Sequence, residues 1–155
     1  LAKRADVFGM TIAYHNRTER DDVSYPYYAS AARLAEACDV MALTCPGGEA
    51  TRNLIDGKVF EALGGKGYLI NIARGSVVDE AALVRALSDH VIAGAGLDVF
   101  AAEPSVPEAL FAMENVVLQP HQASATVETR TAMGNLTIDN LLAHFRGLPL
   151  PNQVA

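Results

Sequence analysis

The sequence predicts an α/β fold built on a doubly wound, parallel sheet, and two patterns carry that prediction. Five short runs rich in apolar and β-branched residues are separated by segments of helical periodicity, an alternation that favours strand–helix–strand units. Most of the runs are continuously apolar, which is typical of parallel strands that are buried on both faces. The runs predicted to be strands are 11–15, 39–43, 68–72, 92–99 and 116–118.

Helical periodicity occupies about half of the remaining chain, with apolar residues recurring on one face of each segment. The segments predicted to be helices are 1–8, 29–37, 56–63, 79–87, 107–113 and 126–145. Asp79 is a good N-cap for its helix, and Gly147 is expected to end the last one. The segment 21–28, with three tyrosines and a proline, is predicted to be a surface loop.

The composition indicates a globular protein and argues against several functions. Half of the 155 residues are hydrophobic and 19% are charged, which is enough apolar material for a core. The net charge of −6 disfavours a nucleic-acid partner, and the absence of a run of 18 apolar residues disfavours a membrane span. Cys38 and Cys45 match neither a redox nor a zinc motif, so we expect no metal site and a cytoplasmic location.

The opening of the chain predicts an incomplete fold. Residues 1–8 form a helical pattern without a cap, a preceding turn or an initiator Met. A G-x-G-x-x-G loop would precede such a helix in a Rossmann-type domain, and no suitable match occurs in these residues. We therefore expect the first strand and its glycine-rich loop to be missing. Because that strand lies centrally in the usual order, the sheet should contain a strand-sized gap.

Three chemically suggestive side chains follow three successive predicted strands. Ligands of open α/β sheets bind outside the carboxyl ends of the strands, where Arg74, Glu103 and His121 are expected. An arginine can bind a carboxylate through two parallel hydrogen bonds, and a histidine can give a proton to a developing alkoxide. A glutamate can hold the imidazole in one tautomer. The trio could thus reduce a 2-oxo acid if a hydride donor lay opposite, although His121 or Arg74 judged alone more often has a structural or surface role.

Three stretches of the sequence resemble the D-isomer-specific 2-hydroxyacid dehydrogenases. They are LINIARGSVVD at 69–79, AGAGLDVF at 93–100 followed by Glu103-Pro104, and NVVLQPHQASAT at 115–126. Residues 106–108 and 127–130 further resemble the branch of glyoxylate/hydroxypyruvate and hydroxyphenylpyruvate reductases. The resemblance implies reduction of a small 2-oxo acid, of the glyoxylate or hydroxypyruvate class, by NAD(P)H to the D-2-hydroxy acid.

The same resemblance implies individual roles. Arg74 would bind the substrate carboxylate, His121 would be the general acid, and Glu103 would orient His121. Asp98 would contact the nicotinamide carboxamide with Ala73 beside the ring. Cys45 and Pro46 would wall the adenosine pocket, although a packing thiol is an alternative for Cys45. Gln122 and Ala123 depart from the family's usual aliphatic and glycine, which affects the expected shape of the substrate pocket.

The residues after the first predicted strand indicate which cofactor is preferred. An acidic residue at that strand tip selects NAD by binding the ribose hydroxyls, and no acid stands there in Tyr14-His15-Asn16-Arg17-Thr18. Arg17 can accommodate a 2′-phosphate and Thr18 can add a hydrogen bond. We expect NADP to be preferred over NAD; alternatively Arg17 is an exposed loop residue and both are used. The predicted cofactor-binding residues are Asn16, Arg17, Thr18, Thr44, Cys45, Pro46, Ala73, Asp98 and Ala123.

The expected organisation is a partial nucleotide-binding domain over 1–125 and a helix with a tail over 126–155. The tail would pack toward a substrate domain that these residues do not include. The resemblance also implies a homodimer formed through the nucleotide-binding domain. Two alternatives remain open: a nucleotide-sensing, corepressor-like member of the same family, which would keep the trio, and an inactive truncated fragment. Turnover of glyoxylate by the full-length protein separates the reductase from the corepressor-like alternative.

Overall fold

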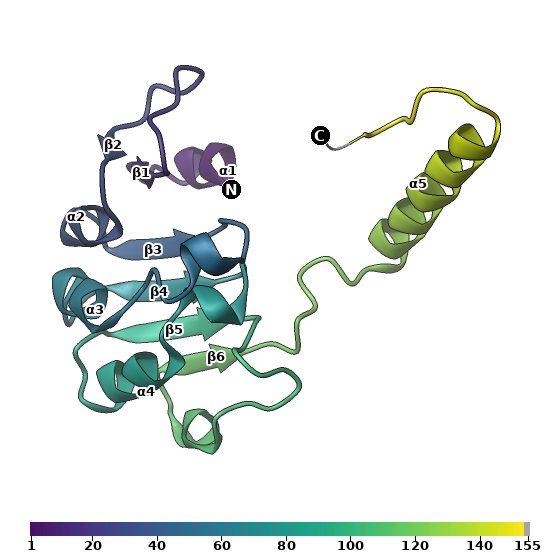
Figure 1. The fold of residues 1–155 in the computed structure, drawn as a ribbon. Helices are drawn as coiled ribbons and strands as arrows, with labels where there is room; N and C mark the ends of the chain where they lie inside the picture. The colour runs from purple at the N-terminus through teal and green to yellow at the C-terminus, as the bar shows by residue number, and fades with distance from the viewer. Residues whose placement is uncertain (154–155) are drawn as a thin grey trace. The chain divides into compact units, whose positions relative to one another are not determined.

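The computed structural model describes residues 1–153 and consists of two compact units, Leu1–Pro120 and His121–Ala155. The first unit contains both sheets and all but one of the helices, whereas the second contains one long helix and a tail (Figure 1).

The main sheet has four parallel strands in the order β3-β4-β5-β6. Their bounds are β3 Val40–Leu43, β4 Tyr68–Asn71, β5 Gly94–Leu97 and β6 Val116–Leu118. All four strands were predicted, and the pairing confirms the parallel α/β fold of Rossmann type. Because the strands are parallel, their carboxyl ends share one edge of the sheet, where the segments 72–74, 98–103 and 119–120 begin.

A second, two-stranded sheet pairs β1 (Tyr14–His15) with β2 (Tyr27–Tyr28) in parallel. The predicted strand 11–15 is therefore limited to its last two residues, and the prediction of a loop over 21–28 was wrong at Tyr27 and Tyr28. Tyrosine fits a pleated, half-buried surface well, and the Tyr14 and Tyr27 rings contact each other with their centroids 5.4 Å apart. That cross-strand contact outweighs the preference of the neighbouring residues for a turn.

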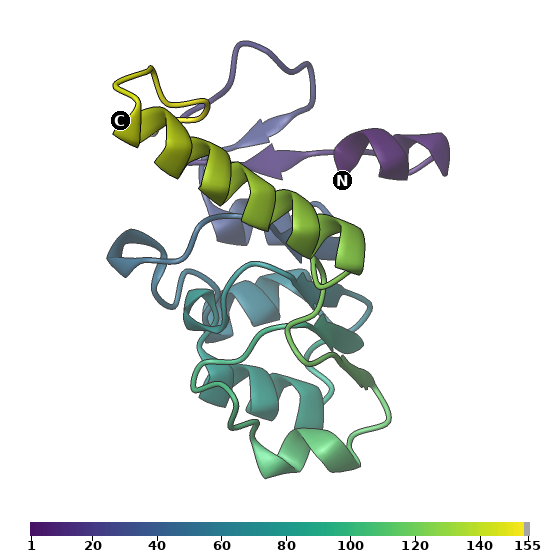
Figure 2. The same ribbon diagram turned by 90° about the vertical axis from the view of Figure 1, so that its right-hand side faces the viewer.

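The two sheets are not joined to each other. Within the described residues β1 pairs only with β2, and β3 pairs only with β4. A hollow of about 440 Å³ is lined by residues of both β1 and β3. The break falls where the expected strand order places its central strand, while α1 (Ala2–Val7) leads into β1 (Figure 2).

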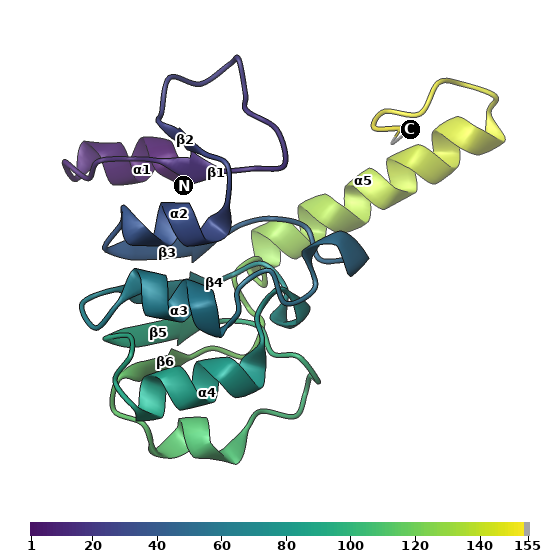
Figure 3. The same ribbon diagram turned by 60° about the vertical axis from the view of Figure 1, so that its left-hand side comes forward.

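Three helices cover one face of the main sheet, as Figure 3 shows. They are α2 (Ala31–Glu36), α3 (Gly57–Leu63) and α4 (Glu80–Ser88), and each begins at a side chain that accepts a backbone N–H: Ser30, Asp56 and Asp79. The predicted cap at Asp79 is confirmed. The segment predicted to be a helix over 107–113 is a 3₁₀ helix, η3 (Glu108–Ala112), which has no side-chain cap. Two further short 3₁₀ helices are η1 (Glu49–Thr51) and η2 (Gly75–Val77).

The core lies between these helices and the sheet. Phe60, Leu69, Leu87 and Ile92 are fully buried there. On the opposite face no element of the unit Leu1–Pro120 covers the apolar side chains, and Val117 is 63% exposed. The expectation that the strands are buried on both faces therefore holds for β5 but was wrong for β3, β4 and β6 within this unit. Apolar runs show which residues need cover but not which segment provides it.

The second unit is built around α5 (Val127–Phe145), which agrees with the helix predicted over 126–145. Its N-cap is Thr126, whose side chain accepts the N–H of Thr129. Gly147, at φ 66°, ends it: the Gly147 and Leu148 N–H groups donate to the carbonyls of His144 and Ala143. The apolar side chains of α5, Met133 and Leu141 among them, are exposed within this unit. In residues 1–153, none of the helices combines the length and hydropathy required of a membrane span.

Candidate functional site

The turn after β4 is built around one buried amide. Asn71, the last residue of β4, is 1% exposed, and both polar atoms of its side chain bond the backbone ahead of it. Its Oδ1 accepts the N–H of Ala73 at 3.0 Å, and its Nδ2 donates to the carbonyl of Arg74 at 3.2 Å. The backbone from which the Arg74 side chain projects is thus held on both sides.

Arg74 itself is exposed at the carboxyl edge of the sheet, as predicted. Its Nη1 donates to the carbonyl of Ala73 at 2.6 Å. Its aliphatic stem passes close to Gly47, where an added Cβ would come within 2.7 Å of the Arg74 Cγ. The stem is therefore supported by the loop after β3, while the charged end of the side chain is accessible to a ligand.

The turns after β4 and β5 are in direct contact. Gly75, which follows Arg74, lies so close to the next turn that an added Cβ would be 1.9 Å from the carbonyl carbon of Phe100. The backbone N–H of Asp98 also donates to the carbonyl of Asn71 at 3.0 Å. Ala73 and Asp98, both predicted cofactor contacts, are consequently buried on adjacent strand ends.

Glu103 lies in the loop after β5, which is held by contacts within the loop and by one contact with α4. The Oε1 of Glu103 accepts the N–H of Phe100 at 2.9 Å. The N–H of Ala101 donates to Oε1 of Glu80, the first residue of α4, at 2.9 Å. The loop is closed by a bridge between Ala102 and Ser105. The two oxygens of a carboxylate offer about four lone-pair sites, so Glu103 can accept more than one hydrogen bond.

His121 is the first residue of the second unit and is exposed. Its φ of 52° places it in the left-handed region, which a residue other than glycine adopts at some cost. Gln122 and Ala123 beside it are exposed as well. The meeting of His121 with Arg74 and Glu103 stays a prediction.

The hollow between β1 and β3 brings together four of the predicted cofactor residues. Asn16 lines it after β1, and Thr44, Cys45 and Pro46 line it after β3. Cys45 is half-buried, and burial raises the pKa of its thiol, so the thiol contributes as a neutral wall at neutral pH. The packing role considered for Cys45 and its place in the wall of the hollow are therefore compatible.

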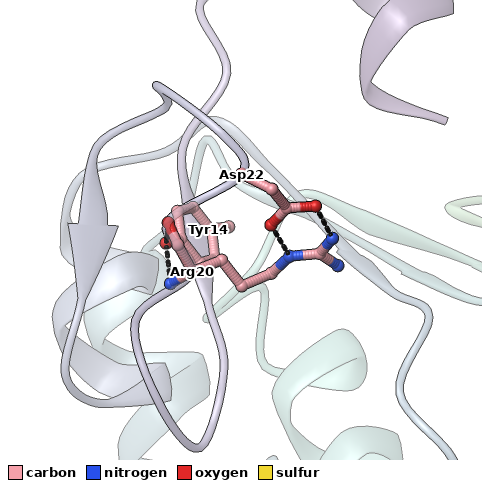
Figure 4. Close-up of polar contacts among 3 residues, drawn as sticks. All are labelled: Tyr14, Arg20 and Asp22. Atoms are coloured by element: carbon pink, nitrogen blue, oxygen red, sulfur yellow. Dashed lines mark hydrogen bonds and ion pairs between the residues drawn. The ribbon is translucent and has the colours of Figure 1, made fainter.

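The loop after β1 is fixed by tyrosine hydroxyls. The Tyr14 hydroxyl accepts the N–H of Arg20 at 2.8 Å, and the Tyr27 hydroxyl donates to the carbonyl of Asn16 at 3.2 Å. The Arg20 guanidinium binds both carboxylate oxygens of Asp22, with Nε donating to Oδ1 at 2.8 Å (Figure 4). This pairing lowers the pKa of the Asp22 carboxyl.

Arg17 lies in the same loop as Arg20 but differs from it in its contacts. Arg17 and Thr18 are exposed and directly follow Asn16, although they are not among the residues that line the hollow. Arg17 forms no ion pair within residues 1–153. Its charge is therefore not neutralised by a carboxylate of the described chain.

These features agree with the comparison to known families. Residues 1–123 match the family described as D-isomer specific 2-hydroxyacid dehydrogenase, NAD binding domain. The chain belongs to that family.

Several relatives of this dehydrogenase domain are enzymes of known name. It is 51% identical over 150 residues to glyoxylate/hydroxypyruvate reductase A of Arabidopsis thaliana, covering 97% of this chain and 48% of that protein. It is 52% identical over 145 residues to 2-ketogluconate reductase of Gluconobacter oxydans, covering 94% and 47%. The chain spans about half the length of the curated relatives it matches.

A solved structure supports the same relationship. The NADPH-dependent glyoxylate/hydroxypyruvate reductase of Sinorhizobium meliloti, in complex with NADP and malonate, matches with a TM-score of 0.97 and 50% identity. The match covers 99% of this chain and 48% of that one.

Four residues that organise the candidate site were not singled out from the sequence: Gly47, Asn71, Gly75 and Glu80. Asn71 carried a usable signal, because a polar residue inside a continuously apolar run must satisfy its hydrogen bonds once it is buried. The other three act through contacts with segments that are distant in the sequence, and such contacts leave no local pattern.

Proposed function

We propose that the protein carrying this chain reduces a small 2-oxo acid of the glyoxylate or hydroxypyruvate class to the D-2-hydroxy acid with NADPH or NADH. The observation that carries the proposal is the paired support of Arg74 and Glu103 at one carboxyl edge of the sheet. The reductases named above, at about half identity, favour the same chemistry.

The residues around the hollow fit a dinucleotide. Asn16, Thr44, Cys45 and Pro46 would contact the adenosine end, since they combine small polar groups with apolar walls between two strand ends. Ala73 and Asp98, buried on neighbouring strands, would contact the nicotinamide end, with Ala123 beside it. The bound nicotinamide would supply the hydride that adds to the carbonyl carbon.

We infer that NADP is preferred over NAD because of Arg17. Its guanidinium has no carboxylate partner in the described chain, whereas Arg20 is engaged by Asp22. A 2′-phosphate can form forked, charge-assisted hydrogen bonds with such a guanidinium, and Thr18 would add a hydroxyl donor. The NADP bound to the S. meliloti reductase favours this assignment.

The chain's own residues would act on the substrate in three ways. Arg74 would bind the carboxylate through its planar fork and so orient the adjacent carbonyl. His121 would donate a proton to the carbonyl oxygen as that oxygen gains negative charge, and would take it back in the reverse direction. Glu103, with Oε1 held by the Phe100 N–H, would use its remaining lone pairs to fix the imidazole in one tautomer.

Three wider features of the protein belong to the same proposal. The nucleotide-binding domain would occupy 1–125, and 126–155 would leave it toward a substrate domain. The exposed apolar side chains of α5 favour such a packing role. The protein would act in the cytoplasm as a homodimer formed through the nucleotide-binding domain.

The test uses the natural protein carrying these residues, hereafter the full-length protein. His121→Ala should lower the rate of glyoxylate reduction by on the order of 10²–10⁴, because the general acid is lost. Arg74→Lys should not restore the activity lost in Arg74→Ala, since an ammonium cannot make the forked contact. Wild-type kinetics in His121→Ala would refute the proposed mechanism. His90→Ala, at an exposed histidine that precedes β5 and so lies away from the carboxyl ends of the strands, is the matched control.

A further inference from the structure

We propose that Asn71 and Glu80 are positioning residues, which hold the Arg74 turn and the Glu103 loop in one rigid support through the contact of Gly75 with Phe100. The proposal rests on the proposed function and extends it, because it assigns roles to side chains that touch neither substrate nor cofactor. Each link in the support is a hydrogen bond or a close backbone contact described above.

The first link is the Asn71 amide. Its two hydrogen bonds, at 3.0 and 3.2 Å, hold the backbone on each side of the Arg74 Cα. Because Asn71 is buried, removing its side chain would leave the Ala73 N–H without this acceptor and away from water. The turn would then relax, and the guanidinium would lose the orientation needed to bind a carboxylate in a forked manner.

The second link is the carboxylate of Glu80, which begins α4 and accepts the Ala101 N–H at 2.9 Å. That contact spans 21 residues of sequence and fixes the loop two residues before Glu103. Phe100, the residue before Ala101, donates its N–H to the Glu103 carboxylate. The loop is therefore held both to α4, through Ala101, and to itself, through Phe100 and Glu103. Loss of the Glu80 oxygen would free the loop that carries Glu103, and with it the carboxylate that the proposed function assigns to orienting His121.

The third link makes the two turns one unit. The Cα of Gly75 is packed against the Phe100–Ala101 peptide so closely that no Cβ fits. The Asp98 N–H also donates to the Asn71 carbonyl at 3.0 Å. A displacement of either turn is therefore transmitted to the other, and the placement of Arg74 relative to the Glu103 loop is set by this contact.

A double-mutant cycle in the full-length protein tests the role of Asn71. Asn71→Ala should raise the KM for glyoxylate by about tenfold, the effect of a lost buried hydrogen bond, and leave the Kd for NADPH within about twofold. If Asn71 acts through Arg74, the double variant Asn71→Ala/Arg74→Ala should have the same KM as Arg74→Ala alone. Asn115→Ala is the matched control. The Asn115 amide also donates to a backbone carbonyl, that of Leu87, with a length of 3.3 Å, but this hydrogen bond lies outside the candidate site.

The outcomes are distinct. Losses that add in the double variant, or an equal rise of KM in Asn115→Ala, overturn the positioning role of Asn71. An unchanged KM in Arg74→Ala overturns the proposed function instead.

A conservative pair of variants tests Glu80. Glu80→Ala should lower kcat by about tenfold, whereas Glu80→Gln should keep nearly wild-type kcat, because the amide oxygen can still accept the Ala101 N–H. A purely electrostatic role at the start of α4 would instead make both variants less stable without changing kcat. Equal kcat in Glu80→Ala and Glu80→Gln overturns the positioning role. Glu61→Ala, at an exposed acid on α3, is the control.

Discussion

Replacing Gly75 with alanine should both destabilise the fold and disrupt the site. The added Cβ would lie 1.9 Å from the Phe100 carbonyl carbon, 2.0 Å from its oxygen and 2.4 Å from the Ala101 nitrogen. All three atoms belong to the backbone, so no side chain can rotate away to relieve the contact. The Phe100–Ala101 peptide must therefore move by about 1.5 Å to reach ordinary van der Waals separation.

The size of the effect follows from that displacement. Overpacking that forces a backbone shift costs about 1–3 kcal/mol, and the short contacts place Gly75→Ala near the upper end. The shift also pulls the Ala101 N–H away from Glu80, and that bond is now 2.9 Å long. Because misplacing a catalytic group by about 1 Å can cost about 10²-fold in rate, kcat/KM for glyoxylate should fall by about that factor.

Urea unfolding and steady-state kinetics of the full-length protein measure the two effects. With a slope of about 2 kcal/mol per M, a loss of about 3 kcal/mol lowers the unfolding midpoint by about 1.5 M. Gly57→Ala is the matched control: it adds the same methyl in the first turn of α3, where nothing lies within 4 Å of an added Cβ. That variant should be unchanged or more stable, by up to about 1 kcal/mol. If the Gly75→Ala variant had the same unfolding midpoint and the same kcat/KM as the Gly57→Ala variant, the turns after β4 and β5 would not be in rigid contact.

The remaining predictions concern the cofactor and the thiols. Arg17→Ala should weaken NADPH binding far more than NADH binding in fluorescence titrations, because only NADPH carries the 2′-phosphate; equal losses would contradict the assignment. Asp22→Asn should tighten NADPH binding relative to NADH binding, since the substitution releases Arg20 and removes a negative charge. An unchanged ratio of the two Kd values would contradict a 2′-phosphate site beside this loop. Burial raises the pKa of the Cys38 and Cys45 thiols in the folded protein. The contribution of these thiols to the free energy of unfolding should therefore be constant below the unfolded thiol pKa of about 8.5 and fall as the pH rises through that value. Cys→Ala variants should abolish this fall. The 155-residue chain alone should bind NADPH very weakly in calorimetry, because these residues include no glycine-rich loop at a helix N-terminus, and micromolar affinity would contradict this.

The features that the sequence predicted by itself are those with a local physical cause. Continuous apolar runs predicted the four main strands, because such runs suit the interior of a parallel sheet. Asp79 and Gly147 predicted helix ends, because a cap satisfies backbone groups only a few residues away. Arg74 and Glu103 were placed at the carboxyl edge for a similar reason, since each lies in the short segment that follows a predicted strand.

Other features were decided only by the tertiary structure. The pairing of Tyr27–Tyr28 with β1, the uncovered face of the main sheet and the engagement of Arg20 by Asp22 could not be predicted from a linear pattern. The support formed by Gly75 and Glu80 likewise depends on which segments meet across the fold. A hydrogen bond over 21 residues, or a glycine required by another peptide's approach, leaves no periodicity in the sequence, because its cause is a neighbour in space rather than along the chain.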